Sequence, residues 1–175
     1  MKKRITLFML ALIFASATVS AQTKMKEYKA GHTFTVNLPD YMNKTAGINT
    51  SSAIEYKSEV KETYGFVIYD LKEDLSLVEL NYASANDFYE DFMKDFLSDV
   101  EKKTVSTPVS KKINETNFLE ADISYYDKDA AMDIYYLVGI VETKKAFYKV
   151  FSWTSTANKD KFKGDFQKIL YSLKD

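Results

Sequence analysis

The part of the chain after Pro108 contains four runs in which apolar residues recur with a period of two. The runs are separated only by the short segments "NETN", "DKDAA" and "TKK". Connections of this length join antiparallel neighbours. This part of the chain therefore predicts a meander of four antiparallel strands, around which the rest of the fold must be built. The four runs are residues 109–113, 118–126, 132–142 and 146–154.

The last two of these runs are apolar on both faces. Residues 134–141, "IYYLVGIV", contain no charged side chain, and residues 147–153 place apolar or aromatic side chains on both sides of the strand. A strand of this kind is usually covered on both sides. We therefore expect helices to pack on both faces of the sheet.

Two segments have the period of an amphipathic helix. Residues 84–103 form the clearer one, and Ser84 can cap its start. Residues 157–174 form the other and close the chain, with Ser155 or Thr156 as its expected cap. The apolar stripe of the first segment consists of Phe88, Phe92, Phe96 and Val100.

Shorter elements precede the first predicted helix. Residues 32–39 alternate between apolar and polar side chains and end at a proline, and residues 53–58 and 64–71 read as two more strands. A short helical turn is expected within residues 73–82. Together these patterns predict an α+β domain: a central antiparallel sheet of about six to seven strands with helices on both faces, an α/β/α sandwich.

The N-terminus has the three parts of a secretory signal peptide. Residues 2–4 are basic, an apolar run follows, and small residues end at Ala21. The run is shorter than the roughly 20 residues that span a bilayer. We therefore expect cleavage between Ala21 and Gln22 and no stable membrane insertion after the signal is removed. The predicted organisation is a signal peptide (1–21), a flexible leader (22–30) and a single globular domain (31–175).

Composition narrows the class of protein further. The chain has no cysteine, which excludes a lipoprotein anchor, disulfide bonds and thiolate metal sites. Three of the 24 Lys and Arg residues lie in the leader, so the mature chain would carry 21 against 25 Asp and Glu, a net charge of −4. This mildly acidic balance argues against nucleic acid as a partner. We expect an exported protein, periplasmic or secreted.

Residue types that catalysis or metal binding requires do not form a pattern. His32, the only histidine, lies at the start of the first predicted strand, and we interpret it as a solvent-facing residue. Asp127, Asp129 and Asp133 lie close together but lack the glycine and the late glutamate of a calcium loop. We interpret them as an acidic turn. We assign no catalytic residue, no metal ligand and no cofactor, and the ligand-binding residues stay unassigned.

Trp153, the only tryptophan, raises the question of a binding site. It shares a strand face with Phe147 and Phe151. Aromatic residues at period two on a covered strand normally belong to the core. We therefore predict that Trp153 packs under a helix.

The order of elements resembles that of a known family. The chain has a first strand with "FTVNLP", then a hairpin, a helix, a long meander, and a closing helix that ends in "ILYSLK". This pattern is similar to the PsbP-like α/β/α sandwich over residues 31–174. That fold is shared by a photosystem accessory protein, a Ran-binding nuclear import factor and many secreted bacterial proteins. The resemblance implies a binding or assembly module and supplies no catalytic residues.

Three classes of function stay open at this stage. The first is a non-enzymatic accessory module that binds an unknown protein partner in the cell envelope. The second is a carrier of a small apolar ligand, which the 25 Tyr and Phe residues suggest. The third, and least supported, is a carboxylate-dependent hydrolase, because two carboxylates can meet in space without any sequence pattern.

Overall fold

The computed structural model describes residues 23–31 and 33–175. The predicted signal peptide, its cleavage site between Ala21 and Gln22, and His32 lie outside these residues. The division of the chain at residue 21 therefore stays a prediction. None of the helices in the described residues is long and apolar enough to cross a membrane.

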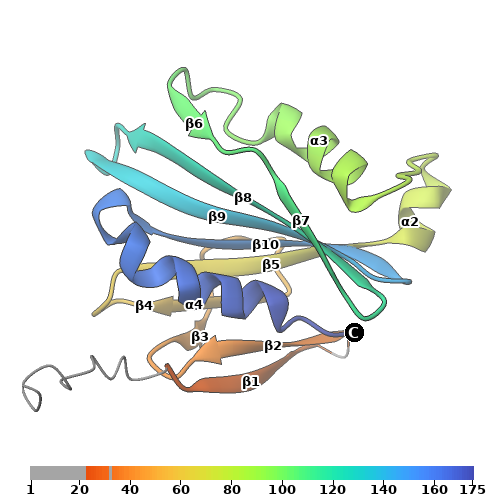
Figure 1. The fold of residues 1–175 in the computed structure, drawn as a ribbon, viewed down its shortest axis with the longest axis horizontal. Coiled ribbons are helices and arrows are strands. Elements are labelled where there is room, and N and C mark those ends of the chain that lie inside the picture. The colour runs from red at the N-terminus through yellow and green to blue at the C-terminus, as the bar shows by residue number, and fades with distance from the viewer. Residues whose placement is uncertain (1–22, 32) are drawn as a thin grey trace, which may run out of the picture.

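The main sheet is antiparallel and, within the described residues, has eight strands (Figure 1). Their order is β3-β4-β5-β10-β9-β8-β6, and β7 also pairs with β8. The meander predicted after Pro108 is confirmed. The strands are β3 (Asn43–Thr45), β4 (Ile54–Ser58), β5 (Thr63–Leu71), β6 (Lys103–Val105), β7 (Val109–Ile113), β8 (Thr116–Asp127), β9 (Met132–Glu142) and β10 (Ala146–Ser155).

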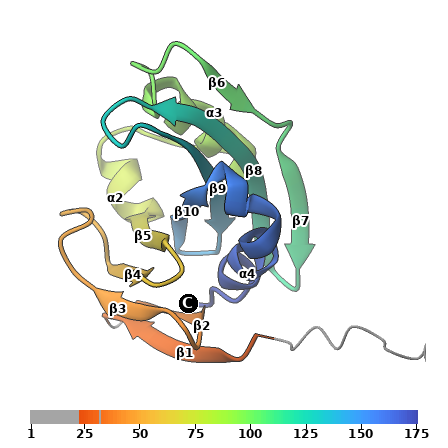
Figure 2. The same cartoon turned by 90° about the vertical axis from the view of Figure 1, so that its left-hand side faces the viewer.

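Helices cover both faces of this sheet, as the apolar strands predicted (Figures 1 and 2). On one face, α3 (Ala85–Asp95) packs its phenylalanines against Phe147 and Phe151 of β10. On the other face, α4 (Lys159–Tyr171) packs with Tyr148 and Val150 of the same strand. The predicted α/β/α sandwich is therefore confirmed. The remaining helical elements are α2 (Lys72–Leu77) and the 3-10 turn η1 (Thr156–Asn158).

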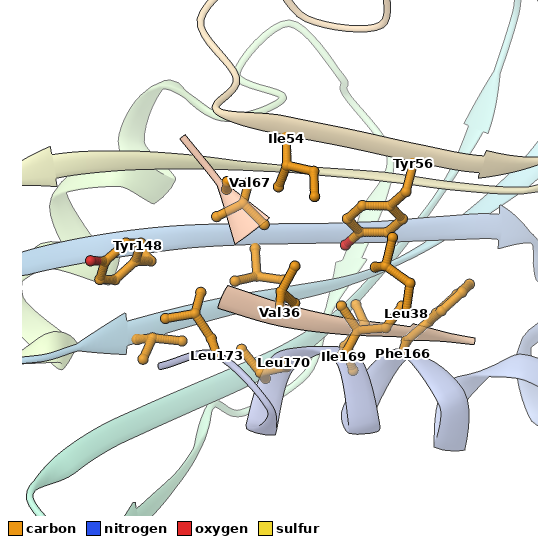
Figure 3. Packing of buried hydrophobic residues seen from close by; sticks show 14 of the residues in the cluster. Val36, Leu38, Ile54, Tyr56, Val67, Tyr148, Phe166, Ile169, Leu170 and Leu173 are labelled. Atoms are coloured by element: carbon orange, nitrogen blue, oxygen red, sulfur yellow. The ribbon is translucent and has the colours of Figure 1, made fainter. Parts of the chain in front are cut away.

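A separate two-stranded ribbon completes the α4 face. It pairs β1 (Met25–Ala30) with β2 (Phe34–Pro39) and does not join the main sheet. Figure 3 shows Val36 and Leu38 of β2 among the core residues of α4 and of the main sheet. The expectation of a flexible leader over residues 22–30 is wrong for β1, because its backbone is held by β2 although its side chains are mostly polar.

The two motifs on which the family resemblance rests lie side by side in space. The backbone N–H of Thr35 in "FTVNLP" donates to the carbonyl of Lys174, 2.8 Å away. Lys174 is the last residue of "ILYSLK". The N–H of Asn37 donates to Ser172 Oγ at 2.8 Å. The C-terminal end of the chain is thereby tied to strand β2.

Helix α3 is shorter than its sequence pattern predicted. Ser84 caps its start, as expected, by accepting the N–H of Asp87. The helix ends at Asp95 because Leu97 has a left-handed backbone with φ of 54°. Lys103 Nζ then donates to the carbonyl of Leu97 at 2.6 Å, which satisfies a free carbonyl at the helix end. Residues 97–102, expected to be helical, instead form a loop.

The closing helix also begins differently from its prediction. Its N-cap is Asn158, which makes no side-chain cap hydrogen bond, so neither Ser155 nor Thr156 caps α4 as expected. The 3-10 turn η1 occupies the place of the predicted first turn.

Candidate binding surface

Four aromatic side chains form a row across the α3 face of the sheet, beyond the end of α3. We call Tyr64, Trp153, Tyr136 and Tyr125 the aromatic row. Each ring stacks on the next, with centroid distances of 5.6, 5.4 and 6.2 Å. All four side chains are half-buried. The row therefore presents partly exposed aromatic surface on a folded sheet.

Strand register creates this row. Trp153 is the direct partner of Tyr64 on β5 and of Tyr136 on β9. Tyr125 on β8 lies diagonally across from Tyr136, within reach of a large side chain. Two phenylalanines that pack against the core also contact the aromatic row. Phe96 meets Tyr136 edge-on at 6.0 Å, and Phe66 meets Trp153 edge-on at 5.8 Å. The rings are therefore fixed in place before any ligand arrives.

A hollow lies at each end of the aromatic row. At the Tyr125 end, a cavity of about 550 Å³ is lined by the loop after α3 and by the β8–β9 turn. At the other end, Tyr64 and Trp153 line a smaller hollow of about 100 Å³ together with Met132 and Ile134. The aromatic surface therefore continues into concave regions on both sides.

Carboxylates line both hollows, four in the large cavity and one in the small hollow. The large cavity is lined by four carboxylates and only two lysines, Lys102 and Lys128, and Glu62 lines the small one. The pKa of Tyr125 is raised chiefly by burial, with further contributions from the charges of Asp127 and Asp99. We call the five carboxylates the acidic rim; they are Glu62, Asp99, Glu101, Asp127 and Asp129.

The predicted acidic turn is confirmed and forms part of this rim. Asp127 Oδ1 accepts the backbone N–H groups of Asp129 and Ala130, both at 2.9 Å, which fixes the turn between β8 and β9. Asp133 is exposed on β9, opposite Tyr126. Among the described residues, no group of three or more acidic, histidine or cysteine side chains has the geometry of a metal site.

The structure corrects the prediction for Trp153. The residue lies on the same face as Phe147 and Phe151, as expected, but it is half-buried and no helix covers it. The reason is the early end of α3 at Asp95. The sequence signal that pointed to the surface was the choice of residue: the strands change from aliphatic and Phe residues to Tyr and Trp at this end.

Buried carboxylates elsewhere in the domain have structural partners. Lys163 and Lys159 both pair with Asp122 of β8, at 2.7 and 3.0 Å. The three most buried carboxylates also accept hydrogen bonds from groups that pack the fold. These are Glu55 (from Ile48, Asn49 and Ser52), Glu120 (from Gln167 and Tyr171) and Asp165 (from Thr23, Tyr41 and Lys168).

A second group of exposed apolar residues lies at the opposite end of the same strands. The row lies where Trp153 pairs with Tyr64, whereas α2 follows the other end of β5, where Ala146 pairs with Leu71. Leu77 and Val78, at the end of α2, are 78% and 65% exposed. They line neither of the two hollows beside the aromatic row, and they provide a comparison site for it.

Comparisons with known proteins show the fold. No family model and no curated protein matches the sequence. Among solved structures, the cyanobacterial PsbP (CyanoP) of Synechocystis sp. PCC 6803 matches with a TM-score of 0.59 and 12% identity, over 93% of this chain and 98% of that one. The Ran-binding protein Mog1p of Saccharomyces cerevisiae matches with a TM-score of 0.60 and 8% identity, over 87% and 95% of the two chains.

LpqN of Mycobacterium tuberculosis, described as involved in cell envelope biogenesis, is also similar. Its TM-score is 0.57 at 8% identity, with 87% of this chain and 90% of that one covered. The three proteins share with this chain the architecture of the described residues and very little sequence. The chain therefore has the PsbP-like fold that its strand and helix order predicted.

Proposed function

We propose that this protein is an exported, non-enzymatic accessory module and that the aromatic row is the surface on which it binds a partner protein. The observation that carries the proposal is the row itself: four stacked, half-buried rings, including the only tryptophan, between two hollows. Aromatic residues are enriched at protein interfaces and dominate their energetics. Pre-fixed rings also lose little side-chain entropy on binding.

The chemistry of the chain favours binding over catalysis. It contains no cysteine and only one histidine. The most buried carboxylates accept hydrogen bonds from side chains that pack the fold, as Glu120 does from Gln167 and Tyr171. They are therefore engaged in the structure and not free to act in catalysis. Four of the five carboxylates of the acidic rim are exposed to solvent, and Asp127 is half-buried.

Proteins of the same fold give independent support for a binding role. Mog1p is described as a Ran-binding protein, and LpqN as involved in cell envelope biogenesis. Neither description names a reaction. A binding module in the cell envelope agrees with both the leader and the aromatic surface of this chain.

A carrier of a small apolar ligand is supported less well. The cavity of about 550 Å³ falls in the size range of ligand pockets. Its lining, however, includes the charged residues Asp99, Glu101 and Asp129, whereas ligand pockets are lined mainly by apolar side chains. A protein partner, which brings its own polar groups, fits this lining better.

Export is tested by the N-terminus of the native protein. Mass spectrometry of protein purified from its own cells should find Gln22, or its cyclised form, as the first residue. Recovery of the mature pool with an intact Met1 would contradict export through a cleaved signal peptide.

The binding surface is tested by quantitative capture from the native cell envelope. Partners retained by the wild-type domain should be lost when Trp153 and Tyr136 are both changed to Ala. The matched control is Leu77→Ser at the far end of the sheet, which should retain them. Loss of the same partners by the control alone would place the binding surface at α2 and overturn the proposal.

A further inference from the structure

Negative charge lies at both ends of the aromatic row. Glu62 lines the small hollow, and the other four carboxylates of the acidic rim line the large cavity. None of the salt bridges within the described residues uses any of these five carboxylates. Their charge is therefore available to a binding partner.

The terminal rings of the row are suited to cations. Within the described residues, Tyr64 stacks only on Trp153, and Tyr125 stacks only on Tyr136. Elsewhere this chain places lysines over its aromatic rings, as with Lys61 Nζ, 3.7 Å from the centroid of Tyr41. No such described contact uses a ring of the row. Aromatic faces beside carboxylates attract Lys and Arg side chains.

We propose that the partner presents a basic segment of polypeptide, with two Lys or Arg side chains that enter the two hollows and apolar residues between them that lie on Trp153 and Tyr136. This inference rests on the proposed function and specifies the chemistry of the partner. Each end of the site supplies a terminal ring together with carboxylate oxygens, and the middle supplies aromatic surface.

The length of the row sets the spacing of the two cations. Three ring-to-ring steps of 5.4 to 6.2 Å separate Tyr64 from Tyr125. An extended peptide advances about 3.3 Å per residue and its side chains alternate between two faces, so basic residues about six positions apart lie on one face and reach both ends. Alternate side chains of such a peptide are about 6.6 Å apart, close to the spacing of the rings.

Other classes of partner fit this charge pattern less well. A nucleic acid and an anionic membrane surface both present phosphates, which the acidic rim repels. An acidic protein segment is repelled in the same way. The carboxylates therefore select a basic partner as well as contribute to its binding.

The inference is tested with synthetic peptides that lack tryptophan, so that Trp153 is the only reporter of binding. One twelve-residue peptide carries two Arg residues six positions apart with Leu and Val between them. A second carries the same residues with the two Arg adjacent, and a third has Glu in place of Arg. Binding is followed by the fluorescence of Trp153 in the mature protein.

The first peptide should bind with a Kd below about 1 mM, should weaken as salt is raised, and should bind several-fold more tightly than the second. The third peptide should not bind. Equal affinity for the Arg and Glu peptides, or no change in Trp153 fluorescence with any of them, would overturn the inference.

Protein variants localise the effect to the acidic rim. The triple variant Asp99→Asn, Glu101→Gln and Asp129→Asn changes only exposed side chains and should weaken the first peptide by about tenfold or more. The matched control removes three exposed carboxylates near α2, and it should change affinity less than about twofold. Equal loss in both variants would overturn the inference. The control variant is Glu73→Gln, Asp74→Asn and Glu79→Gln.

The result also separates this inference from the proposed function. If the Trp153 and Tyr136 variant loses its native partners but the peptides show no charge preference, the partner is not basic. The aromatic row is then still the binding surface. If that variant keeps all native partners, the proposed surface itself is wrong.

Discussion

Gly139 of β9 lies directly against the side chain of Leu170 in α4, so close that a Cβ at residue 139 would overlap with the leucine methyl groups. Both residues belong to the packed interior of the α4 face, where Leu170 is fully buried. The glycine therefore sets how closely the helix approaches the sheet. Its place in the run "IYYLVGIV" is explained by this contact.

Replacement of Gly139 by Ala should lower the free energy of unfolding by about 1–3 kcal/mol, because α4 must move away from the sheet. Urea denaturation measures the change. The control is Gly164→Ala on the exposed side of α4, where an added Cβ meets nothing within 4 Å. That change should raise the free energy of unfolding by up to about 1 kcal/mol. Destabilisation of equal size at both positions would contradict the packing argument.

Phe88 of α3 and Phe147 of β10 should be energetically coupled. Their rings are buried and stacked, with centroids 4.6 Å apart and an interplanar angle of 6°. Changing either residue to Leu should cost about 1 kcal/mol of stability. A double-mutant cycle should give a coupling energy of about 0.5–1.5 kcal/mol. Strictly additive losses would mean that the two rings do not interact.

Stability should fall in acid because of Glu142. Burial raises the pKa of this carboxyl, but hydrogen bonds from Lys72 and Asn117 outweigh burial and lower it below its usual range. A pKa that is lower in the folded state stabilises the fold above the unfolded value. That contribution is lost as the pH falls through the folded value.

We therefore expect the free energy of unfolding to decrease between about pH 6 and pH 3, with a shallower decrease in Glu142→Gln. The control is Glu115→Gln, since Glu115 forms an exposed salt bridge with Lys144, with side chains 78% and 77% exposed. Chemical denaturation at a series of pH values measures both variants. Parallel curves for wild type and Glu142→Gln would contradict the assignment.

Quenching of Trp153 should depend on the charge of the quencher. The residue is half-buried, so neutral acrylamide should quench part of its emission. Glu62 lines the same hollow, so at equal ionic strength caesium ions should quench Trp153 relatively more than iodide ions, when each is compared with its quenching of free N-acetyltryptophanamide. Glu62→Gln should reduce the difference. A ratio of iodide to caesium quenching higher than that of free N-acetyltryptophanamide would show that the potential at the aromatic row is not negative.

Most of the fold could be predicted because local patterns and tertiary packing agree along the meander. The strands from Val109 to Ser155 either alternate or are apolar on both faces, and their turns are too short for any connection other than a hairpin. The strand β1 could not be predicted, since its residues are mostly polar and gain their order from pairing with β2. The first predicted strand was expected in the main sheet, but β2 belongs to that separate ribbon.

The candidate surface was harder to predict than the fold, and one residue explains why. The pattern of Phe92, Phe96 and Val100 continues past the end of α3, so the sequence predicts a longer helix above Trp153. The left-handed backbone of Leu97 ends the helix instead. A leucine gives no sequence signal for that conformation, which glycine or asparagine would have indicated. The face of Trp153 was therefore predictable, whereas its exposure was not.

The link between Lys174 and Thr35 has a consequence for the order in which this protein matures. The last helix supplies Phe162, Phe166, Ile169 and Leu170 to the interior, and the terminal segment fastens the first ribbon. These partners are separated by more than 120 positions in the sequence, so the ribbon gains its packing only after the last helix has docked on the sheet. Contacts between such distant segments form late because the loop between them must close first, so we expect the α4 face to be the last part of the domain to become ordered during folding.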